Sequence, residues 1–456
     1  MSHATVSLET DFAAIVGPSR MSTEAATCAG FEVDGVRPQC VVYAASAEQA
    51  AEVLKCAAAR DLAVIPSRNG TKLGIGSPPR RYDVALSVKD MNQVWYYEPD
   101  DLVVSVEPGM KFGDLQHFLG RHKLWIPLDP AGGERASVGG ILAANAAGPL
   151  RLHFGGPRDM VLGMKIATVE GKVIKTGGRV VKNVAGYDLG KLLIGSYGTL
   201  GVIVEATFKL FPQVAERATW VFELATLAAA RDLRRQVLSS PLRPLRMALL
   251  NPAAVALLED EAQTGHAGPG RAAADEIWIE AGGSERVIAR YSSEFDALAA
   301  KLDTPLHRIE DEVAARTWER IADFGLWLTH EKEVPMVLRA ALPIASAEEF
   351  VERAEREARA EKLEVIALAQ LGAGVVEVGL AANPGPRTPS PDLIAKLRQV
   401  AAELGGSLVV ARCPAELKSQ IDVWGPPGDD FEAMRKLKSA WDPKGTLAPG
   451  RFFGGI

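Results

Sequence analysis

Glycine is concentrated between residues 130 and 212, and this stretch constrains the fold more than any other. Three clusters lie there between apolar segments: Gly132 with Gly133, three glycines within residues 139–148, and three more within residues 195–201. Glycine adopts positive φ and lets the main chain pass close to another group. A packed core of loops would account for one such cluster, but hardly for all three. We therefore predict that this backbone lies against a large flat or highly charged group, as in a cofactor cradle.

Composition narrows the class of protein. Apolar residues make up 47% and charged residues 24% of the 456 residues, as in ordinary globular proteins of two or three domains. The formal net charge of −6 argues against a general nucleic-acid surface, which needs an excess of basic residues. No apolar run is long enough to span a bilayer, and residues 1–5 lack the features of a signal peptide. We expect a cytoplasmic location, with contact to the inner face of the membrane only through partners.

The cysteines are scattered along the chain at Cys28, Cys40, Cys56 and Cys413. No two of them form a C-x-x-C pair, so their spacing favours neither a zinc site nor an iron–sulfur cluster. Reduced, buried thiols are the expected interpretation. A redox protein of this kind would have to pass its electrons to another protein.

A βαβ unit is predicted near the N-terminus. Residues 41–44 and 63–65 have the apolar pattern of strands, and Ser46 with Gln49 forms a capping box that begins the helix between them. The loop 66–74 then lies at the carboxyl end of the second strand, where α/β sheets usually bind ligands. It offers hydroxyl, amide and cationic donors, which favours phosphate contact over a solvated surface turn. The P-loop and the complete G-x-G-x-x-G signature are absent from the sequence, so an ordinary nucleotide-binding fold is disfavoured.

Further elements follow by their periodicity. We predict a strand at 102–107, a helix after residue 111, a hairpin at 165–169 and 172–176, and a strand at 202–210. In the second half, strands are expected at 277–280, 336–342, 365–370 and 375–380, with helices at 346–361 and 390–405. Such alternation predicts an α+β domain in which helices cover one side of an antiparallel sheet. Residues 1–32 are expected to form an extension or a short helical arm.

The order of these pieces resembles the FAD-binding family of vanillyl-alcohol oxidase and p-cresol methylhydroxylase. The likeness covers about residues 34–213 and resumes at 441–451; its specific blocks are GRVVKNVAGYD at 178–188 and GTLGVI at 198–203. Within the family the pattern is most similar to the FAD-binding E subunits of bacterial glycolate oxidases, also called glycolate dehydrogenases. The resemblance implies an α+β chain with a two-lobed FAD-binding domain at 33–213, a cap domain at 214–425, and a segment at 426–456 that returns to the FAD domain.

The resemblance also implies which residues contact the cofactor, although it identifies no catalytic residue. Loops 66–74 and 130–140 lack the His or Cys that carries covalent flavin in some relatives, so non-covalent FAD is expected. The implied contacts are Pro66, Ser67, Arg68, Asn69, Gly70, Thr71 and Lys72 in the pyrophosphate loop, Pro130, Gly132, Ser137, Val138, Gly139, Gly140, Asn145 and Gly148 in a second segment, Lys182 and Asn183 in the block at 178–188, and Val202 and Ile203 through their backbone.

The sequence departs from the family at one decisive place. Where FAD-linked 2-hydroxy-acid dehydrogenases carry two metal-binding histidines, this chain has Gln370 and Glu377. Glutamine is a poor ligand, and one carboxylate seldom holds zinc, so we predict no metal there. Ala448 is a smaller departure, since asparagine often precedes the terminal Pro-Gly of the family.

These departures shape the expected function. The resemblance implies an FAD-binding subunit that acts with a second FAD subunit and an iron–sulfur subunit to oxidise glycolate to glyoxylate. Without the histidines, this flavin is expected to relay electrons rather than to oxidise the acid alone. Two alternatives stay open. One is a self-sufficient dehydrogenase of another small hydroxy acid or alcohol, in which Arg339, Arg412 or Lys418 clamps a carboxylate. The other is a non-redox assembly subunit that keeps FAD for its structure.

Overall fold

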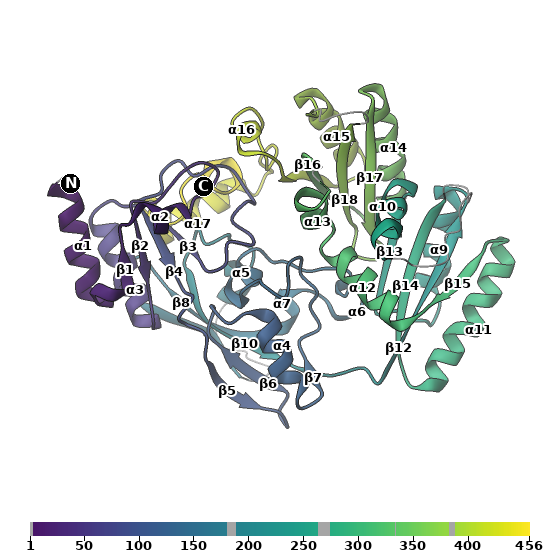
Figure 1. The fold of residues 1–456 in the computed structure, drawn as a ribbon, viewed down its shortest axis with the longest axis horizontal. Coiled ribbons are helices and arrows are strands. Elements are labelled where there is room, and N and C mark those ends of the chain that lie inside the picture. The colour runs from purple at the N-terminus through teal and green to yellow at the C-terminus, as the bar shows by residue number, and fades with distance from the viewer. Residues whose placement is uncertain (1–2, 180–187, 263–273, 333, 383–387) are drawn as a thin grey trace.

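The structure is a computed structural model that describes residues 3–179, 188–262, 274–332, 334–382 and 388–456. Its strands form two groups (Figure 1): three small sheets from residues 21–212 and one large sheet from residues 216–412. The C-terminal segment, yellow in the figure, lies beside the first group, near the N-terminal helices. This is the predicted α+β arrangement of a two-lobed domain and a cap with a returning C-terminus. We keep 33–213, 214–425 and 426–456 as proposed domain limits.

The first lobe contains the predicted βαβ unit. Strands β2 (Cys40–Tyr43), β4 (Val84–Ser87) and β3 (Val64–Ser67) run parallel, and β1 (Met21–Ser22) pairs antiparallel with β2. Helix α3 (Ala47–Ala59) begins where the Ser46 side chain accepts a hydrogen bond from the backbone N–H of Gln49 at 3.2 Å, half of the predicted capping box. Helix α1 (His3–Val16) buries Phe12 and Val16 in the same core, so the N-terminal segment is a packed part of this lobe.

The second lobe is an antiparallel sheet in the order β5-β6-β10-β8-β9. The predicted hairpin and the strand near 202 are both present, and the hairpin turns at Gly171, where φ is 79°. Helix α4 (Phe112–Gly120) packs on this sheet through Phe112, Leu115 and Leu119. The strands are β5 (Val94–Glu98), β6 (Val103–Val106), β8 (Val161–Ala167), β9 (Val173–Gly177) and β10 (Val202–Lys209).

The cap is built on one eight-stranded antiparallel sheet, in the order β15-β12-β14-β13-β17-β18-β16-β19. Its strands are β12 (Glu216–Leu224), β13 (Arg246–Leu250), β14 (Asp275–Gly283), β15 (Leu306–Ile309), β16 (Met336–Ala341), β17 (Leu363–Gln370), β18 (Val375–Ala382) and β19 (Ser407–Arg412). In the described residues, no helix is long and apolar enough to cross a membrane.

Helices cover both faces of the cap sheet, so the prediction of one covered side is wrong. Strand residues alternate between two cores: Ile277 and Ile279 face the first, whereas Trp278 faces the second, against Trp318. The sequence analysis identified no helix for the second face, although Ala314, Trp318 and Ile321 repeat there at helical spacing and are buried. The first face is covered by α9 (Leu227–Ser239), α11 (Glu285–Leu302), α14 (Ala347–Ala360) and α15 (Pro391–Glu403), and the second by α10 (Pro252–Ala262), α12 (Asp311–Ala322) and α13 (Phe324–His330).

Short elements complete the described chain. They are η1 (Pro18–Arg20), α2 (Ala25–Ala29), β7 (Leu124–Trp125), α5 (Val138–Ala143), α6 (Arg151–Phe154), α7 (Pro157–Met160), α8 (Leu189–Leu193), β11 (Phe211–Pro212), η2 (Ile344–Ser346), α16 (Ala415–Lys418), α17 (Phe431–Trp441) and η3 (Phe453–Gly455).

A buried ion pair fixes the returning C-terminal segment. The ammonium of Lys438, on α17, donates to Asp442 at 2.7 Å and to the carbonyl oxygens of Thr199 and Leu447, both at 2.8 Å. The same carboxylate accepts hydrogen bonds from the backbone N–H groups of Thr446 and Leu447. Residues 446–448 then pair with Val64 of β3, so the pair holds this segment against the strand that precedes loop 66–74.

We predict that Asp442→Ala destabilises the fold by about 3–5 kcal/mol, because it leaves a buried ammonium without its counter-charge. The measurement is the denaturant midpoint of unfolding, followed by tryptophan fluorescence. Glu432→Ala is the control, since Glu432 forms an exposed pair with Arg435 on the same helix and should change stability by less than about 1 kcal/mol. Equal midpoints for the two variants would contradict a fixing role for Asp442.

Candidate functional site

The predicted cofactor loops surround two adjoining cavities. The first, here called the Lys72 cavity, has a volume of about 640 Å³, and the second, the Val202 cavity, about 480 Å³. Six residues line both, so the cavities form one long groove between the loop after β3 and the segment around α5. The shared residues are Pro66, Ser67, Arg68, Ser137, Gly140 and Ala143.

Most of the residues implied as cofactor contacts line this groove. Those in the Lys72 cavity are Pro66, Ser67, Arg68, Asn69, Gly70, Thr71, Lys72, Ser137 and Gly140, and the Val202 cavity adds Gly139, Val202 and Ile203. Pro130, Gly132, Val138, Asn145 and Gly148 are not among the lining residues of either cavity. Lys182 and Asn183 lie outside the described residues. The assignment of individual contacts to FAD stays a prediction.

Residues of the second segment that do not line the cavities have definite partners. Gly148 donates its N–H to Asp129 at 3.1 Å, and a Cβ at this position would lie 2.2 Å from the Asp129 carbonyl oxygen. Val138 is the first residue of α5, and its side chain is buried in the core. Gly132, at φ 66°, donates its N–H to Asp323 of the cap at 2.6 Å. These contacts fix the second segment without touching the groove.

The groove presents unsatisfied donors, which fits an anionic group. Ser67 Oγ and Arg68 Nε are buried and have no hydrogen-bond partner among the described residues. Buried polar groups are nearly always paired, so an unpaired hydroxyl and guanidinium nitrogen on one loop indicate a missing partner. Burial lowers the pKa of Arg68, while the carboxylate of Asp114 acts in the opposite direction. Phosphate groups would supply both the acceptors and the negative charge that these groups lack, so we predict that the phosphates of FAD lie here.

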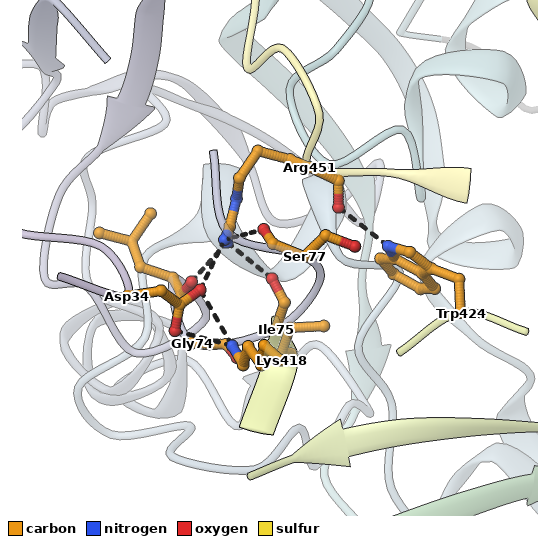
Figure 2. A network of polar contacts seen from close by, with 8 residues as sticks. Asp34, Gly74, Ile75, Ser77, Lys418, Trp424 and Arg451 are labelled. Atoms are coloured by element: carbon orange, nitrogen blue, oxygen red, sulfur yellow. Dashed lines mark hydrogen bonds and ion pairs between the residues drawn. The ribbon is translucent and has the colours of Figure 1, made fainter. Parts of the chain in front are cut away.

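Arg451 holds the far end of the same loop (Figure 2). Its guanidinium donates to the backbone oxygens of Leu73, Ile75 and Ser77, and to Asp34 at 3.1 Å. Asp34 comes from the N-terminal segment and also accepts from Lys418 at 2.8 Å. Lys418 is therefore a structural cation, buried away from the groove, and not a carboxylate clamp. The sequence offered no signal for Asp34, because its partners lie 384 and 417 residues away.

A third hollow lies between the groove and the cap. This interdomain pocket has a volume of about 630 Å³ and shares Lys72, Ile75, Ala144 and Tyr197 with the Lys72 cavity. The polar side chains on its cap side are those of Arg339 on β16, Gln370 on β17, Glu377 on β18 and Arg412 on β19. The strand register places these four side chains on one face of the sheet, the face that carries α13. The structure thus brings two of the three predicted clamp residues together.

The interdomain pocket is cationic. Glu377 lies 3.9 Å from Arg339 and accepts a hydrogen bond from the N–H of Gly325 at 3.2 Å, so it offsets one guanidinium. The structure records no ion pair for Arg412 in the part of the chain that it describes, and burial lowers the pKa of Arg412. Gln370 Oε1 is buried without a partner. With Lys72 protonated, the three cations outnumber the two carboxylates that act on them, Glu377 and Asp323, which suits a small anionic ligand.

Gln370 and Glu377 occupy the two positions at which the sequence analysis predicted that no metal is bound. Among the described residues, no three His, Cys, Asp or Glu side chains come together in an arrangement able to hold a metal ion. The absence of a bound metal stays a prediction. Ala448 lines the Lys72 cavity with φ 44°, a conformation that asparagine adopts more readily than alanine.

The chain matches two family models: "FAD binding domain" over residues 38–177, and "FAD linked oxidases, C-terminal domain" over residues 213–410 and 424–452. It is 25% identical to the glycolate oxidase subunit GlcD of Bacillus subtilis (91% of this chain, 89% of the relative). It is 30% identical to the D-lactate dehydrogenase of Archaeoglobus fulgidus (90% of each chain). A solved structure of p-cresol methylhydroxylase superposes with a TM-score of 0.73 at 17% identity and covers 99% of this chain and 97% of its own, which shows the shared fold.

We predict that Arg68→Met raises the dissociation constant for FAD by about 10- to 100-fold, the loss expected for a hydrogen bond to a charged group worth about 1.5–3 kcal/mol. Quenching of flavin fluorescence on titration into the apoprotein measures it. Arg290→Met, an exposed change on α11, is the control. Unchanged affinity in Arg68→Met would show that this side chain faces no phosphate.

Proposed function

This chain belongs to the FAD-linked oxidases, and on that premise we propose that it oxidises a small 2-hydroxy acid to the 2-oxo acid as the FAD-binding subunit of a glycolate oxidase complex. Glycolate, which would become glyoxylate, is the first candidate substrate. The proposal rests on the FAD family, on relatives named for glycolate and D-lactate, and on the cationic pocket beside the groove.

The observation that carries the proposal is the position of two guanidiniums. Arg339 and Arg412 lie on adjacent strands of the cap and line a pocket that shares Lys72 and Tyr197 with the flavin groove. Guanidinium groups bind carboxylates through paired hydrogen bonds, and burial strengthens this attraction. A 2-hydroxy acid held this way would present its remaining atoms toward the groove.

The reaction divides between cofactor and chain. FAD, held non-covalently in the long groove by the residues predicted above, supplies the hydride acceptor. The chain's own groups bind the carboxylate, exclude water between the domains and receive the hydroxyl proton. Gly132 and Asp323 support this arrangement, since their 2.6 Å hydrogen bond joins the second flavin segment to the cap wall of the pocket.

Electrons then have to leave the flavin. The described residues contain no cluster of metal-ligating side chains that could act as a second redox centre. We propose that an iron–sulfur subunit takes the electrons and that a second FAD subunit completes the complex. The subunit name of the Bacillus relative supports an assembly of this kind. We place the complex in the cytoplasm, with any membrane contact made by its partners.

The relay role is the second candidate. Glu377 faces Arg339 where the family has a metal ligand, so it competes with a substrate carboxylate for that guanidinium. In this case the sister subunit oxidises the acid, and the flavin of this chain only passes electrons on. The self-sufficient dehydrogenase would differ in accepting another hydroxy acid or alcohol without partners.

The experiment is anaerobic bleaching of the flavin in the purified chain by glycolate, D-lactate and related acids. We predict bleaching in the wild type, and a half-saturating acid concentration about 10- to 100-fold higher in Arg412→Met, because a charged hydrogen bond is lost. Arg286→Met, exposed on α11, should match the wild type.

Other outcomes select the alternatives. A flavin that no acid bleaches in the isolated chain, but that is reduced within the complex, supports the relay role. A flavin that is reduced in neither setting supports the structural, non-redox role. Turnover of an acid or alcohol other than glycolate, without partners and with an artificial acceptor, supports a self-sufficient dehydrogenase.

A further inference from the structure

Lys72 occupies the boundary between the two parts of the proposed site. It comes from the loop after β3, lines the Lys72 cavity of the groove, and also lines the interdomain pocket. Its ammonium donates a hydrogen bond to the Ala131 carbonyl oxygen in the second flavin segment. Lys72 is therefore placed where a flavin in the groove and an acid in the pocket would meet.

The partners of Lys72 differ from those of the other enclosed lysines. Lys418 pairs with Asp34 at 2.8 Å, and Lys438 pairs with Asp442 at 2.7 Å. For Lys72 the described structure records only the bond to a neutral carbonyl. A nearby carboxylate favours the charged form of a lysine, whereas nearby cations favour the neutral amine.

Resting on the proposed function, we propose that Lys72 is a catalytic residue of this chain: its neutral amine accepts the hydroxyl proton of the 2-hydroxy acid. The carboxylate of the acid lies on the guanidiniums of Arg339 and Arg412. As the proton moves to Nζ, the bond between the α-carbon and its hydrogen breaks, and that hydrogen leaves with the electron pair for FAD. The carbon–oxygen double bond of the 2-oxo acid forms from the remaining pair on oxygen. The products are the 2-oxo acid, protonated Lys72 and the two-electron-reduced flavin.

The surrounding charges favour a neutral amine. Burial, and then the cations Arg412 and Arg339, lower the pKa of Lys72 to about 8, while Asp323 and Glu377 act in the opposite direction. A group with this pKa is deprotonated in roughly one molecule in ten at pH 7, compared with roughly one in two thousand for a free lysine. A pKa near the working pH is what general-base catalysis requires.

The other titratable groups of the interdomain pocket fit this role less well. Burial raises the pKa of Tyr197, so its hydroxyl keeps its proton. Glu377 accepts a hydrogen bond from the Gly325 N–H and faces Arg339, so its carboxylate is already engaged by other groups. Guanidinium groups do not deprotonate in proteins. Among the described residues that line this pocket there is no histidine.

The test uses the FAD-loaded chain and two opposite pH dependences. Oxalate, a dianion shaped like the acid, is titrated while the flavin absorbance is followed, which needs no turnover. We expect the affinity for oxalate to fall as pH rises through about 8, because the ammonium of Lys72 loses its charge. The rate of anaerobic flavin reduction by glycolate should instead rise over the same range, because the neutral amine is the base.

Three variants separate a base from a mere cation. Lys72→Met should lose both pH transitions and about 10²- to 10⁴-fold in the reduction rate, the range found for general bases. Lys72→Arg should bind oxalate with no transition near pH 8 and still fail to reduce flavin quickly. Lys72→Ala should regain rate with added methylamine. Lys396→Met, exposed on α15, is the control.

Two results would overturn the inference while leaving the proposed function intact: full activity in Lys72→Arg, or a Lys72→Met variant whose flavin is reduced as fast as that of the wild type. The absence of an oxalate transition near pH 8 in the wild type would also overturn it. Failure of every 2-hydroxy acid to reduce the wild-type flavin, in spite of normal oxalate binding, would instead refute the proposed function and the catalytic role of Lys72 with it.

Discussion

The guanidinium of Arg451 is the contact on which the site depends most. It donates hydrogen bonds to three backbone oxygens of residues 73–77 and to the carboxylate of Asp34, and so joins the N-terminal segment, the loop after β3 and the C-terminal segment. A buried charge of this kind has to be fully satisfied, because desolvation otherwise costs several kcal/mol. Since the same loop carries Ser67, Arg68 and Lys72, the position of the cofactor donors and of the proposed base follows from this one cluster.

A second cluster, also of charged residues, joins the cap to the FAD-binding domain. Arg246 of β13 forms two hydrogen bonds with Glu280, at 2.8 and 2.9 Å, and lies 3.7 Å from Asp129, whose carboxylate holds the N–H groups of Gly148 and Leu150. Burial raises the pKa of Asp129 to about 7, although Arg246 opposes it. The cap sheet therefore meets the second flavin segment through charged groups, and the interdomain pocket opens beside that contact. The positions of Arg339 and Arg412 relative to the groove depend on this contact between the cap and the FAD-binding domain.

Local patterns predicted the parts of the site that are local in sequence. Residues 66–72 line the groove as expected, because a loop that follows a parallel strand lies at the carboxyl edge of the sheet. Its hydrogen-bond donors are also adjacent in the sequence. The glycines were also informative. Gly139 lies so close to Pro108 that a Cβ added at Gly139 would be only 2.8 Å from the Cβ of Pro108, so glycine is needed at this position. Residues 1–32 were expected only as an extension or a short helical arm, although Leu8, Phe12 and Val16 repeat every four residues and are buried in helix α1.

Long-range pairings could not be predicted in this way. Asp34 meets Arg451, and Gly132 meets Asp323, only after distant segments have packed, and no periodicity encodes either pair. The convergence of Arg339, Glu377 and Arg412 depends on the register of β18, β16 and β19, including an irregularity beside Val337 that turns Arg412 toward the pocket. A one-residue shift would place these side chains on the opposite face. For that reason the sequence suggested the clamp residues one by one and could not distinguish Lys418, which is structural, from the other two.

We propose that FAD lies non-covalently along the groove formed by loop 66–72 and the α5 segment. Its most direct test is the flavin content of the purified native chain, measured by absorbance before and after acid precipitation. We predict one FAD per chain, released into the supernatant, and the same stoichiometry when apoprotein is reloaded. A folded chain that is colourless and takes up no FAD would contradict it.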